Sequence, residues 1–195
     1  MKDILTLLRD SGAMLEGHFL LSSGRHSNCY FQCAKLLQYP DKAAAAFSAV
    51  ADKIKQDKLE IHAVAGPAMG GIIAAYELAR QLGLPAFFTE RDDKGVMVLR
   101  RGFEAPPGCK ILIVEDVVTT GKSFGECAVA LESLGASIAA LACLVDRRQA
   151  SSLGDKVEIP WPFYPACAVD AANWEAESCE MCIKGIPLVK PGSRK

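Results

Sequence analysis

Two long apolar runs near the middle of the chain constrain its fold most strongly. Residues 110–116 read KILIVED and residues 137–146 read SIAALACLVD, and neither run alternates between apolar and polar residues. A helical pattern, FGECAVALESLG (124–135), separates them and ends at Gly135. Strands that are apolar on both faces and are joined by a helix are typical of a mostly parallel sheet with helices on both faces. The pattern predicts an α/β fold.

The rest of the chain continues this alternation. The apolar spacing predicts further helices over 2–10, 42–56 and 71–83, and further strands over 61–66, 85–90 and 96–100. Asp41 is predicted to cap the second of these helices. From Trp161 onward the chain is rich in Pro, Cys and small residues, which indicates an irregular segment.

Charge and apolar content exclude several classes of protein. The 22 Lys and Arg residues nearly balance 23 Asp and Glu residues, and the net charge of −1 does not suit a broadly basic nucleic-acid binder. The first apolar stretch is cut by Asp3, Arg9 and Asp10, so it does not read as a signal peptide. No apolar run approaches the ~20 residues of a membrane span. We therefore expect a cytoplasmic protein with no nucleic-acid or membrane partner.

The segment VEDVVTTGKS carries the functional signal. Its strand brings Glu115 and Asp116 to a carboxyl end, which is where parallel sheets bind ligands. The small, hydroxyl-rich loop that follows leads into a helix, whose first backbone N–H groups can bind phosphate. Gly121 allows that backbone to approach a ligand closely. Two acids beside an anion site indicate a ligand with both hydroxyl and phosphate groups, such as a phosphorylated sugar.

Two better-known phosphate motifs are excluded. GKS at 121–123 resembles the end of a P-loop, but the first glycine of that motif would fall on Asp116. GPAMGG (66–71) is not the dinucleotide-binding fingerprint, because its third position is Ala68. The remaining alternative is that VEDVVTTGKS is an acidic turn that only caps a helix. The order of two acidic residues, two threonines, a glycine and a serine after an apolar strand is too specific to favour this alternative.

Three segments resemble one known family. Residues 115–123 resemble the phosphoribosyl pyrophosphate (PRPP) signature of type I phosphoribosyltransferases. HFLLSSGRHSNCYFQ (18–32) is similar to the N-terminal hood of the orotate phosphoribosyltransferases, and VAGPAMGGI (64–72) is similar to their pyrophosphate loop. The resemblance implies the type I phosphoribosyltransferase fold and Mg²⁺-dependent transfer of phosphoribose from PRPP to orotate, in pyrimidine synthesis.

The resemblance also implies how the chain is divided. It runs from about His18 to Arg148 and suggests one phosphoribosyltransferase domain over residues 1–195. Within that domain we expect a small hood formed mainly by residues 1–40 and an irregular C-terminal appendage over 161–195.

Site residues follow from the same resemblance, position by position. Glu115 and Asp116 would hold the ribose hydroxyls, and the rest of the PRPP site would be Val117, Val118, Thr119, Thr120, Gly121, Lys122 and Ser123. Orotate would contact Thr119, Arg147, Tyr30 and Phe31. Because a guanidinium fork can pair with both oxygens of a carboxylate, Arg147 suits the acid group of orotate. Without the resemblance, Arg147 could equally lie at a solvated strand end. An aromatic pair such as Tyr30 and Phe31 is more often part of a hydrophobic core.

A polar stretch, TERDDKGVM, matches the flexible catalytic loop of the family. The resemblance implies that Arg91 and Lys94 bind PRPP and assist catalysis together with Asp116, and that the loop reaches the site of a second subunit in a homodimer. Mg²⁺ would be held mainly by PRPP rather than by side chains. Without the resemblance, this charge run would read as a solvated turn.

The sequence departs from the family pattern at several positions. Many members have Lys where Ser22 and Gly70 stand, and the loop around Lys94 is short and lacks its usual His. Fewer cations would then face the leaving group. We read these differences as a variant branch of the family.

Two rival functions stay open. One is the same transfer to a purine such as adenine or xanthine, which has no carboxylate for Arg147. The other is a non-catalytic regulator that senses PRPP and binds nucleic acid, which the near-neutral charge does not favour.

Cys179 and Cys182 form a lone C-x-x-C pair with three readings. The pattern favours reduced, structurally incidental thiols. A zinc site is possible, completed by Cys167, Cys29, Cys33 or one of the three histidines at 18, 26 and 62, and it could bridge subunits. The third reading is an oxidisable pair.

Overall fold

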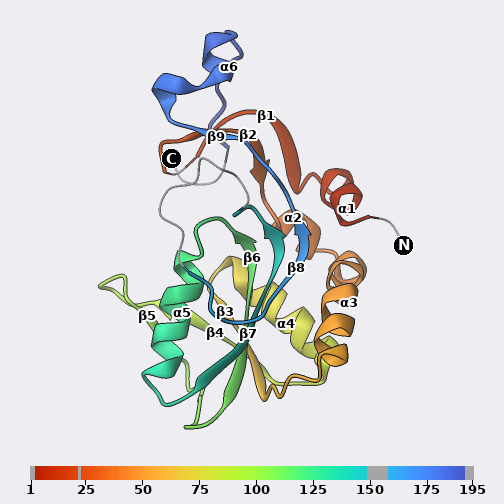
Figure 1. The fold of residues 1–195 in the computed structure, drawn as a ribbon, viewed down its shortest axis with the longest axis vertical. Helices are drawn as coiled ribbons and strands as arrows, with labels where there is room; N and C mark the ends of the chain where they lie inside the picture. The colour runs from red at the N-terminus through yellow and green to blue at the C-terminus, as the bar shows by residue number, and fades with distance from the viewer. Residues whose placement is uncertain (1–2, 22, 149–157, 192–195) are drawn as a thin grey trace.

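A six-stranded sheet forms the centre of the molecule (Figure 1). The computed structural model describes residues 3–21, 23–148 and 158–191. In sheet order the strands are β5 (Met97–Leu99), β4 (Ala86–Arg91), β3 (Ala63–Pro67), β6 (Lys110–Val118), β7 (Ser137–Asp146) and β8 (Phe163–Ala168). All neighbours are parallel except β4 and β5, which pair as an antiparallel hairpin. The predicted mostly parallel sheet is confirmed.

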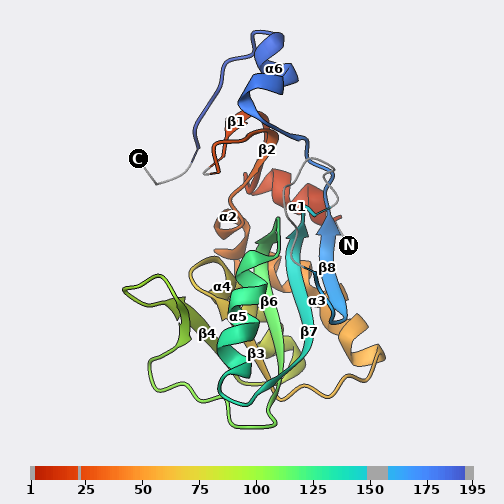
Figure 2. The ribbon, with the colours of Figure 1, turned by 60° about the vertical axis from the view of Figure 1, so that its left-hand side comes forward.

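Helices cover both faces of this sheet. Helices α3 (Pro40–Gln56) and α4 (Gly70–Leu82) lie on one face, and α5 (Lys122–Glu132) lies on the other (Figure 2). Alternate residues of β6 therefore enter different cores: Leu112 and Val114 pack on the α3–α4 side, whereas Ile111 and Ile113 pack on the α5 side. This double burial explains why β6 and β7 are apolar without alternation. None of the helices in the described residues is long and apolar enough to cross a membrane.

A second, three-stranded antiparallel sheet lies above the carboxyl ends of β6 and β7 (Figures 1 and 2). It consists of β1 (Met14–Leu20), β2 (His26–Phe31) and β9 (Asn173–Trp174), with β2 in the middle. We call this sheet the hood. Two short helices, α1 (Ile4–Asp10) and α2 (Ala34–Leu37), connect it to the main core.

The C-terminal part is more ordered than the sequence indicates. Residues 163–168, expected to be irregular, form β8 and pair in parallel with β7. Pro165 obscured this strand in the sequence, but an edge strand tolerates a residue without an N–H group. The chain then supplies β9 to the hood, a 3₁₀ turn at Ala176–Ser178 and helix α6 (Glu180–Ile183).

The predicted cap of α3 is wrong by two residues. The helix begins at Pro40, with Tyr39 as the capping residue, and Asp41 lies in the first turn. Proline is well suited to the first helical position because its N–H group would be unpaired there anyway. The acidic side chain of Asp41 then stabilises the positive end of the helix dipole rather than capping it.

Candidate active site

The carboxyl ends of β6 and β7 meet beneath the hood. The two strands pair from Lys110 with Ser137 to Val118 with Asp146. Beyond the last pair, the backbone N–H of Arg147 donates to the carbonyl oxygen of Val118 over 2.8 Å. Parallel pairing therefore brings the acidic pair, the loop that follows it and Arg147 to one edge of the sheet.

Glu115 and Asp116 are largely removed from solvent. The pKa of the Glu115 carboxyl is raised to about 8, mainly by burial and also by the charge of Asp116, while a hydrogen bond with Ser123 opposes the shift. The pKa of Asp116 is also raised, mainly by burial, although its Oδ1 accepts a 2.9 Å hydrogen bond from the Val117 N–H. In the described part of the chain, no Lys, Arg or His side chain forms an ion pair with either carboxylate. The pair is therefore poised to accept hydroxyl donors or a cation.

The loop after the acids leads directly into α5. Gly121 precedes the helix with a φ of 84°, a left-handed conformation that favours glycine. The N–H of Lys122 donates to Thr120 Oγ1 over 3.3 Å, which closes the turn. The first turn of α5 contains no acidic residue. Its N–H groups and the positive end of the helix dipole form a site suited to a phosphate group.

The loop between β3 and α4 packs against the acidic pair. A Cβ atom placed on Gly70 would lie only 2.5 Å from Asp116 Oδ1. The same loop is tight at Gly66, where a Cβ atom would lie 2.3 Å from the carbonyl oxygen of Gly71. Gly70 thus leaves the space that the Asp116 carboxylate occupies, so a lysine at this position would require that carboxylate to move. Ser22, the other departure from the family pattern, lies outside the described residues.

Arg147 is buried without an acidic partner. Its neighbour Asp146 is engaged by Arg148, whose Nε and Nη2 donate to the two carboxylate oxygens over 3.0 and 3.2 Å. Among the described residues Arg147 has no ion pair, its side chain is 4% exposed, and its Nε is buried without a hydrogen-bond partner. Burial lowers the pKa of its guanidinium. A buried cation with an unused donor favours an anionic ligand.

Strand β2 supplies the contacts that Arg147 does make. Its Nη2 donates to Ser27 Oγ over 3.0 Å, and its guanidinium lies 5.3 Å from the centre of the Phe31 ring. Ser27 belongs to the site but was not singled out by the sequence, because a serine in a strand has no distinguishing pattern. Only the folded arrangement of β2 over β7 reveals its role.

Tyr30 and Phe31 do not lie together. Successive residues of a strand point to opposite faces. Phe31 lies against Arg147, whereas the Tyr30 ring packs 6.0 Å from that of Phe19 and its hydroxyl hydrogen-bonds Gln32 Oε1 over 3.0 Å. The structure therefore brings Phe31, but not Tyr30, to the guanidinium.

Arg91 and Lys94 lie in the β4–β5 hairpin at the far edge of the sheet. Arg91 donates to the carbonyl oxygen of Gly95 over 2.7 Å and forms an ion pair with Glu126 on α5. The hairpin turn is closed by Asp92, whose Oδ1 accepts from the Lys94 N–H over 2.9 Å. The Lys94 side chain is exposed. Within this single chain, the hairpin lies beside α5.

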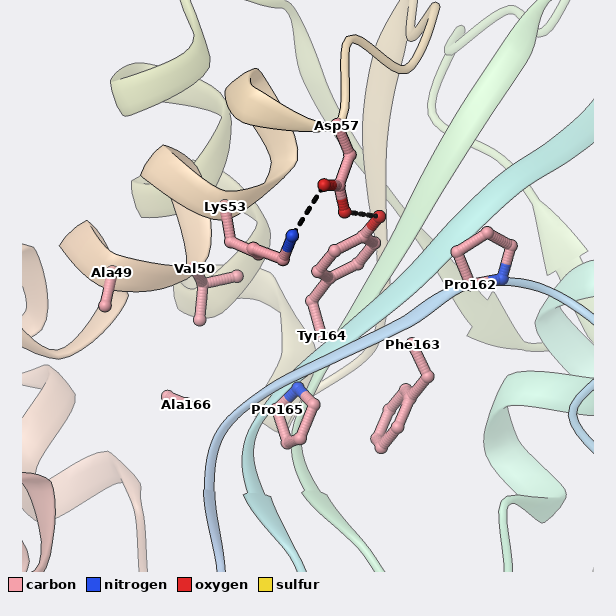
Figure 3. A pocket seen from close by; sticks show the side chains of 9 residues that line it. All are labelled: Ala49, Val50, Lys53, Asp57, Pro162, Phe163, Tyr164, Pro165 and Ala166. Carbon is pink, nitrogen blue, oxygen red and sulfur yellow. Dashed lines mark hydrogen bonds and ion pairs between the residues drawn. The ribbon is translucent and has the colours of Figure 1, made fainter.

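The surface pocket in Figure 3 is distinct from this site. It has a volume of about 450 Å³ and lies between α3 and residues 162–166. Its polar groups already satisfy one another, since Asp57 accepts hydrogen bonds from Lys53 over 2.6 Å and from Tyr164 over 2.8 Å. None of the residues that line it belongs to the acidic pair, to the loop at 117–123 or to the contacts of Arg147.

Comparison with known proteins agrees with this geometry. The phosphoribosyl transferase domain family matches residues 34–163. An orotate phosphoribosyltransferase of Carboxydothermus hydrogenoformans is 49% identical over 193 residues, which are 99% of this chain and 98% of the relative. The chain belongs to the orotate phosphoribosyltransferase family. The family predicted from the PRPP signature and the hood segment is thereby confirmed.

Solved structures agree with this family assignment. The crystal structure of orotate phosphoribosyltransferase from Aeropyrum pernix superposes with a TM-score of 0.71 at 28% identity, covering 85% of this chain and 93% of that one. An adenine phosphoribosyltransferase from Leishmania tarentolae also matches, with a TM-score of 0.63 at 15% identity over 87% of this chain and 88% of its own. An adenine phosphoribosyltransferase thus shares this fold, so the fold by itself does not identify the substrate.

Replacing Glu115 with Gln should stabilise the protein, and more so at pH 8 than at pH 5. Burial raises the pKa of Glu115 in the native state to about 8, whereas an unfolded chain ionises this group with a pKa of about 4.3. Between pH values of about 4.3 and 8, the Glu115 carboxyl is ionised in the unfolded state but still protonated in the native state. The free energy of unfolding of the wild type therefore falls as pH rises through this range. The amide of Gln does not ionise, so the variant does not lose this stability.

Thermal unfolding at both pH values tests this expectation. Glu132→Gln, at an exposed position of α5, is the control. A difference in Tm between wild type and Glu115→Gln that is the same at pH 5 and pH 8 would contradict the assignment of a raised pKa.

Proposed function

We propose that this chain transfers the 5-phosphoribosyl group of PRPP to orotate, giving orotidine 5′-monophosphate and pyrophosphate. The observation that supports orotate as the acceptor is Arg147, a buried guanidinium whose neighbouring acid is already paired with Arg148. The orotate carboxylate would supply the missing anion, and a purine base has no such group. This activity belongs to pyrimidine biosynthesis, which we expect to be cytoplasmic.

The acidic pair and the loop divide the recognition of PRPP between them. Glu115 and Asp116 accept hydrogen bonds from the ribose 2′- and 3′-hydroxyls, which replace the solvent that burial removed. The 5-phosphate binds to residues 119–123, where the N-terminus of α5 supplies N–H groups and a favourable dipole. Arg147 and Phe31 hold the pyrimidine, beside Thr119 at the end of β6. Tyr30 remains a prediction from the sequence.

Electrostatics explains how these groups accelerate the reaction. Displacement of pyrophosphate at the anomeric carbon passes through an oxocarbenium-like state, as in glycoside chemistry. The Asp116 carboxylate stabilises the positive charge that develops on the ribose, and fixed groups that face developing charge are a large source of catalysis. Arg91 and Lys94 act on the opposite charge, which grows on the departing pyrophosphate. Arg91 must exchange its ion pair with Glu126 for this contact.

The donor set at the site also fits Mg²⁺. Partly buried carboxylates without a cationic partner among the described residues provide hard oxygen ligands, and Mg²⁺ usually binds one or two such groups together with substrate phosphates. Glu115 and Asp116 would complete the coordination of an ion held mainly by PRPP. When bound, Mg²⁺ supplies positive charge to the pyrophosphate leaving group.

A homodimer would place the hairpin over a second site. Three apolar side chains on one face of α4 support this proposal: Met69 is 83% exposed, Ile73 44% and Tyr76 66%. They follow one another at helical spacing and form an apolar strip of the kind that marks a protein interface. Arg91 and Lys94 are exposed on a hairpin at the edge of the sheet, where a loop shared between subunits could reach a second site.

An assay of orotate consumption with PRPP and Mg²⁺ tests the proposed function. We expect the wild-type protein to consume orotate and to ignore adenine and xanthine. Asp116→Asn should lower kcat by about 100-fold, because it removes a charge that faces the developing cation. PRPP binding without orotate-dependent release of pyrophosphate would instead support a PRPP-sensing regulator.

Replacing Arg147 with Gln should weaken orotate binding specifically. A hydrogen-bonded charged pair contributes about 1.5–3 kcal/mol, so KM for orotate should rise by about 10- to 100-fold while KM for PRPP changes little. Steady-state kinetics with each substrate varied in turn measures both constants. Arg80→Gln, an exposed position on α4, is the matched control. An equal rise in both constants would argue against a direct contact with orotate.

Replacing Gly70 with Ala should impair the use of PRPP. The added methyl group would meet the Asp116 carboxylate and displace it from the ribose. Because displacements near 1 Å can cost about 100-fold in activity, kcat/KM for PRPP should fall by about that factor. Circular dichroism should show the wild-type fold, and an unchanged kcat/KM would show that Asp116 has room to move.

Mixed dimers should reveal the shared loop. Asp116→Asn and Lys94→Ala each damage one component of the site, and we expect each variant alone to be nearly inactive. If the loop acts across the interface, a dimer with one chain of each kind contains one intact site, so mixing after unfolding and refolding should restore activity. A mixture no more active than its components would indicate a loop that serves its own subunit.

A further inference from the structure

Four metal-ligating side chains meet at the hood, apart from the site beneath it. His18 lies on β1, His26 on β2, and Cys179 and Cys182 flank the first turn of α6. Each offers one ligand atom, and these atoms all lie within 4.8 Å of one another. The sequence separates the histidines from the cysteines by about 150 residues, so their convergence results from the fold.

The spacing of the ligand atoms matches a tetrahedral zinc site. His18 Nε2 lies 3.0 Å from His26 Nδ1 and 3.3 Å from Cys179 Sγ. Cys182 Sγ lies 3.7 Å from His18 Nε2 and 3.3 Å from His26 Nδ1. Zn–N bonds of 2.0–2.1 Å and Zn–S bonds of 2.3 Å give tetrahedral edges of about 3.3 Å between nitrogens and about 3.5 Å between nitrogen and sulfur. One ion could therefore contact all four atoms with little movement.

The second ring nitrogen of His18 is already oriented for this role. Its Nδ1 lies 2.8 Å from the carbonyl oxygen of Ile186, to which it donates a hydrogen bond. That bond leaves the lone pair of Nε2 free to face the cluster. Metal-binding histidines typically donate their other N–H group to a carbonyl or a carboxylate in this way.

Burial and donor type both favour a structural zinc ion. His18 is 2% exposed, His26 5% and Cys179 0%, while Cys182 is at the surface. The cluster contains no carboxylate. Two imidazoles and two thiolates favour Zn²⁺ over Mg²⁺ or Ca²⁺, and four protein ligands leave no open position for catalysis.

The C-terminal segment needs such a link. Among residues 175–191 only Cys179 is buried, and Ile183 is 79% exposed. Its backbone contacts with β1 are few: the Leu20 N–H donates to the Val189 carbonyl and the Val189 N–H to the His18 carbonyl, each over 2.9 Å. Apolar burial therefore contributes little to holding this segment, and a metal ion would stabilise it as it does other small units without a core.

We propose that His18, His26, Cys179 and Cys182 bind one structural Zn²⁺ that fixes the C-terminal segment to the hood. Binding releases the two thiol protons to solvent, so the ion meets two thiolates and two neutral imidazoles. The ion joins β1 and β2 to α6. Because Ser27 follows His26 and contacts Arg147, the metal also steadies the strand that lies over the orotate site.

Metal analysis of protein purified without chelator is the first test. We expect about one zinc per chain, the stoichiometry of a four-ligand site, and loss of most of it in Cys182→Ser. Cys182 is exposed, so this variant should keep its fold. Cys109→Ser and His62→Asn, which remove a cysteine and a histidine outside the cluster, should retain the metal. Absence of zinc from the wild type, or zinc that survives Cys182→Ser, would overturn the proposal.

Cobalt substitution tests the ligand set independently of activity. Protein reconstituted with Co²⁺ should show the visible bands of a tetrahedral ion and a thiolate charge-transfer band, both reduced in Cys182→Ser. Chelation should lower the Tm of wild type and leave that of Cys182→Ser unchanged. Thiol counting on the denatured wild-type protein separates the alternatives: a disulfide between Cys179 and Cys182, or free thiols in a protein that takes up no Co²⁺, would contradict the site.

Discussion

The parallel pairing of β6 with β7 is the interaction on which the site depends. It sets Val118 opposite Asp146, and the hydrogen bond from the Arg147 N–H to the Val118 carbonyl extends the register beyond the last pair. A shift of one residue would turn the side chains of one strand toward the opposite faces of the sheet. The apolar cores on both sides of β6 prevent such a shift, so the packing that stabilises the sheet also fixes the positions of the charged groups.

Within that frame, the acidic pair and Arg147 are withdrawn from solvent without forming ion pairs among the described residues. The acids have raised pKa values and Arg147 a lowered one, each mainly because of burial. Asp146 and Arg148, by contrast, neutralise each other. The free protein thus retains an electrostatic cost that a ligand with hydroxyls at one end and a carboxylate at the other can relieve. Affinity and orientation then come from the same unsatisfied groups.

The sequence predicted the features that depend on neighbouring residues. The apolar runs, the acidic pair and the glycine before α5 are local, and each lies where its pattern indicates. Arg147 could be proposed as a site residue only through the family resemblance. The sequence does not show that the neighbouring carboxylate, Asp146, pairs with Arg148 and leaves Arg147 without an acidic partner. Tyr30 and Phe31 point in opposite directions because successive residues of a strand alternate between its faces. This could be inferred only once the structure showed that both residues lie in β2.

Long-range contacts account for what could not be predicted. Strand β8 was obscured by Pro165 and is stabilised by pairing with β7, and β9 is too short to carry a pattern of its own. The C-x-x-C pair had several possible partners in the sequence, and only the folding of β1 and β2 against α6 selects His18 and His26.

The hood joins strands from opposite ends of the described chain: β9 at residues 173–174 pairs with β2 at residues 26–27. During synthesis the first two strands of the hood leave the ribosome early, whereas their third strand emerges after the whole central sheet. The nascent protein can therefore assemble its central sheet before the hood is complete, so completion of the hood is among the last steps of folding. A polypeptide truncated before β9 would retain the central sheet beneath an unfinished hood.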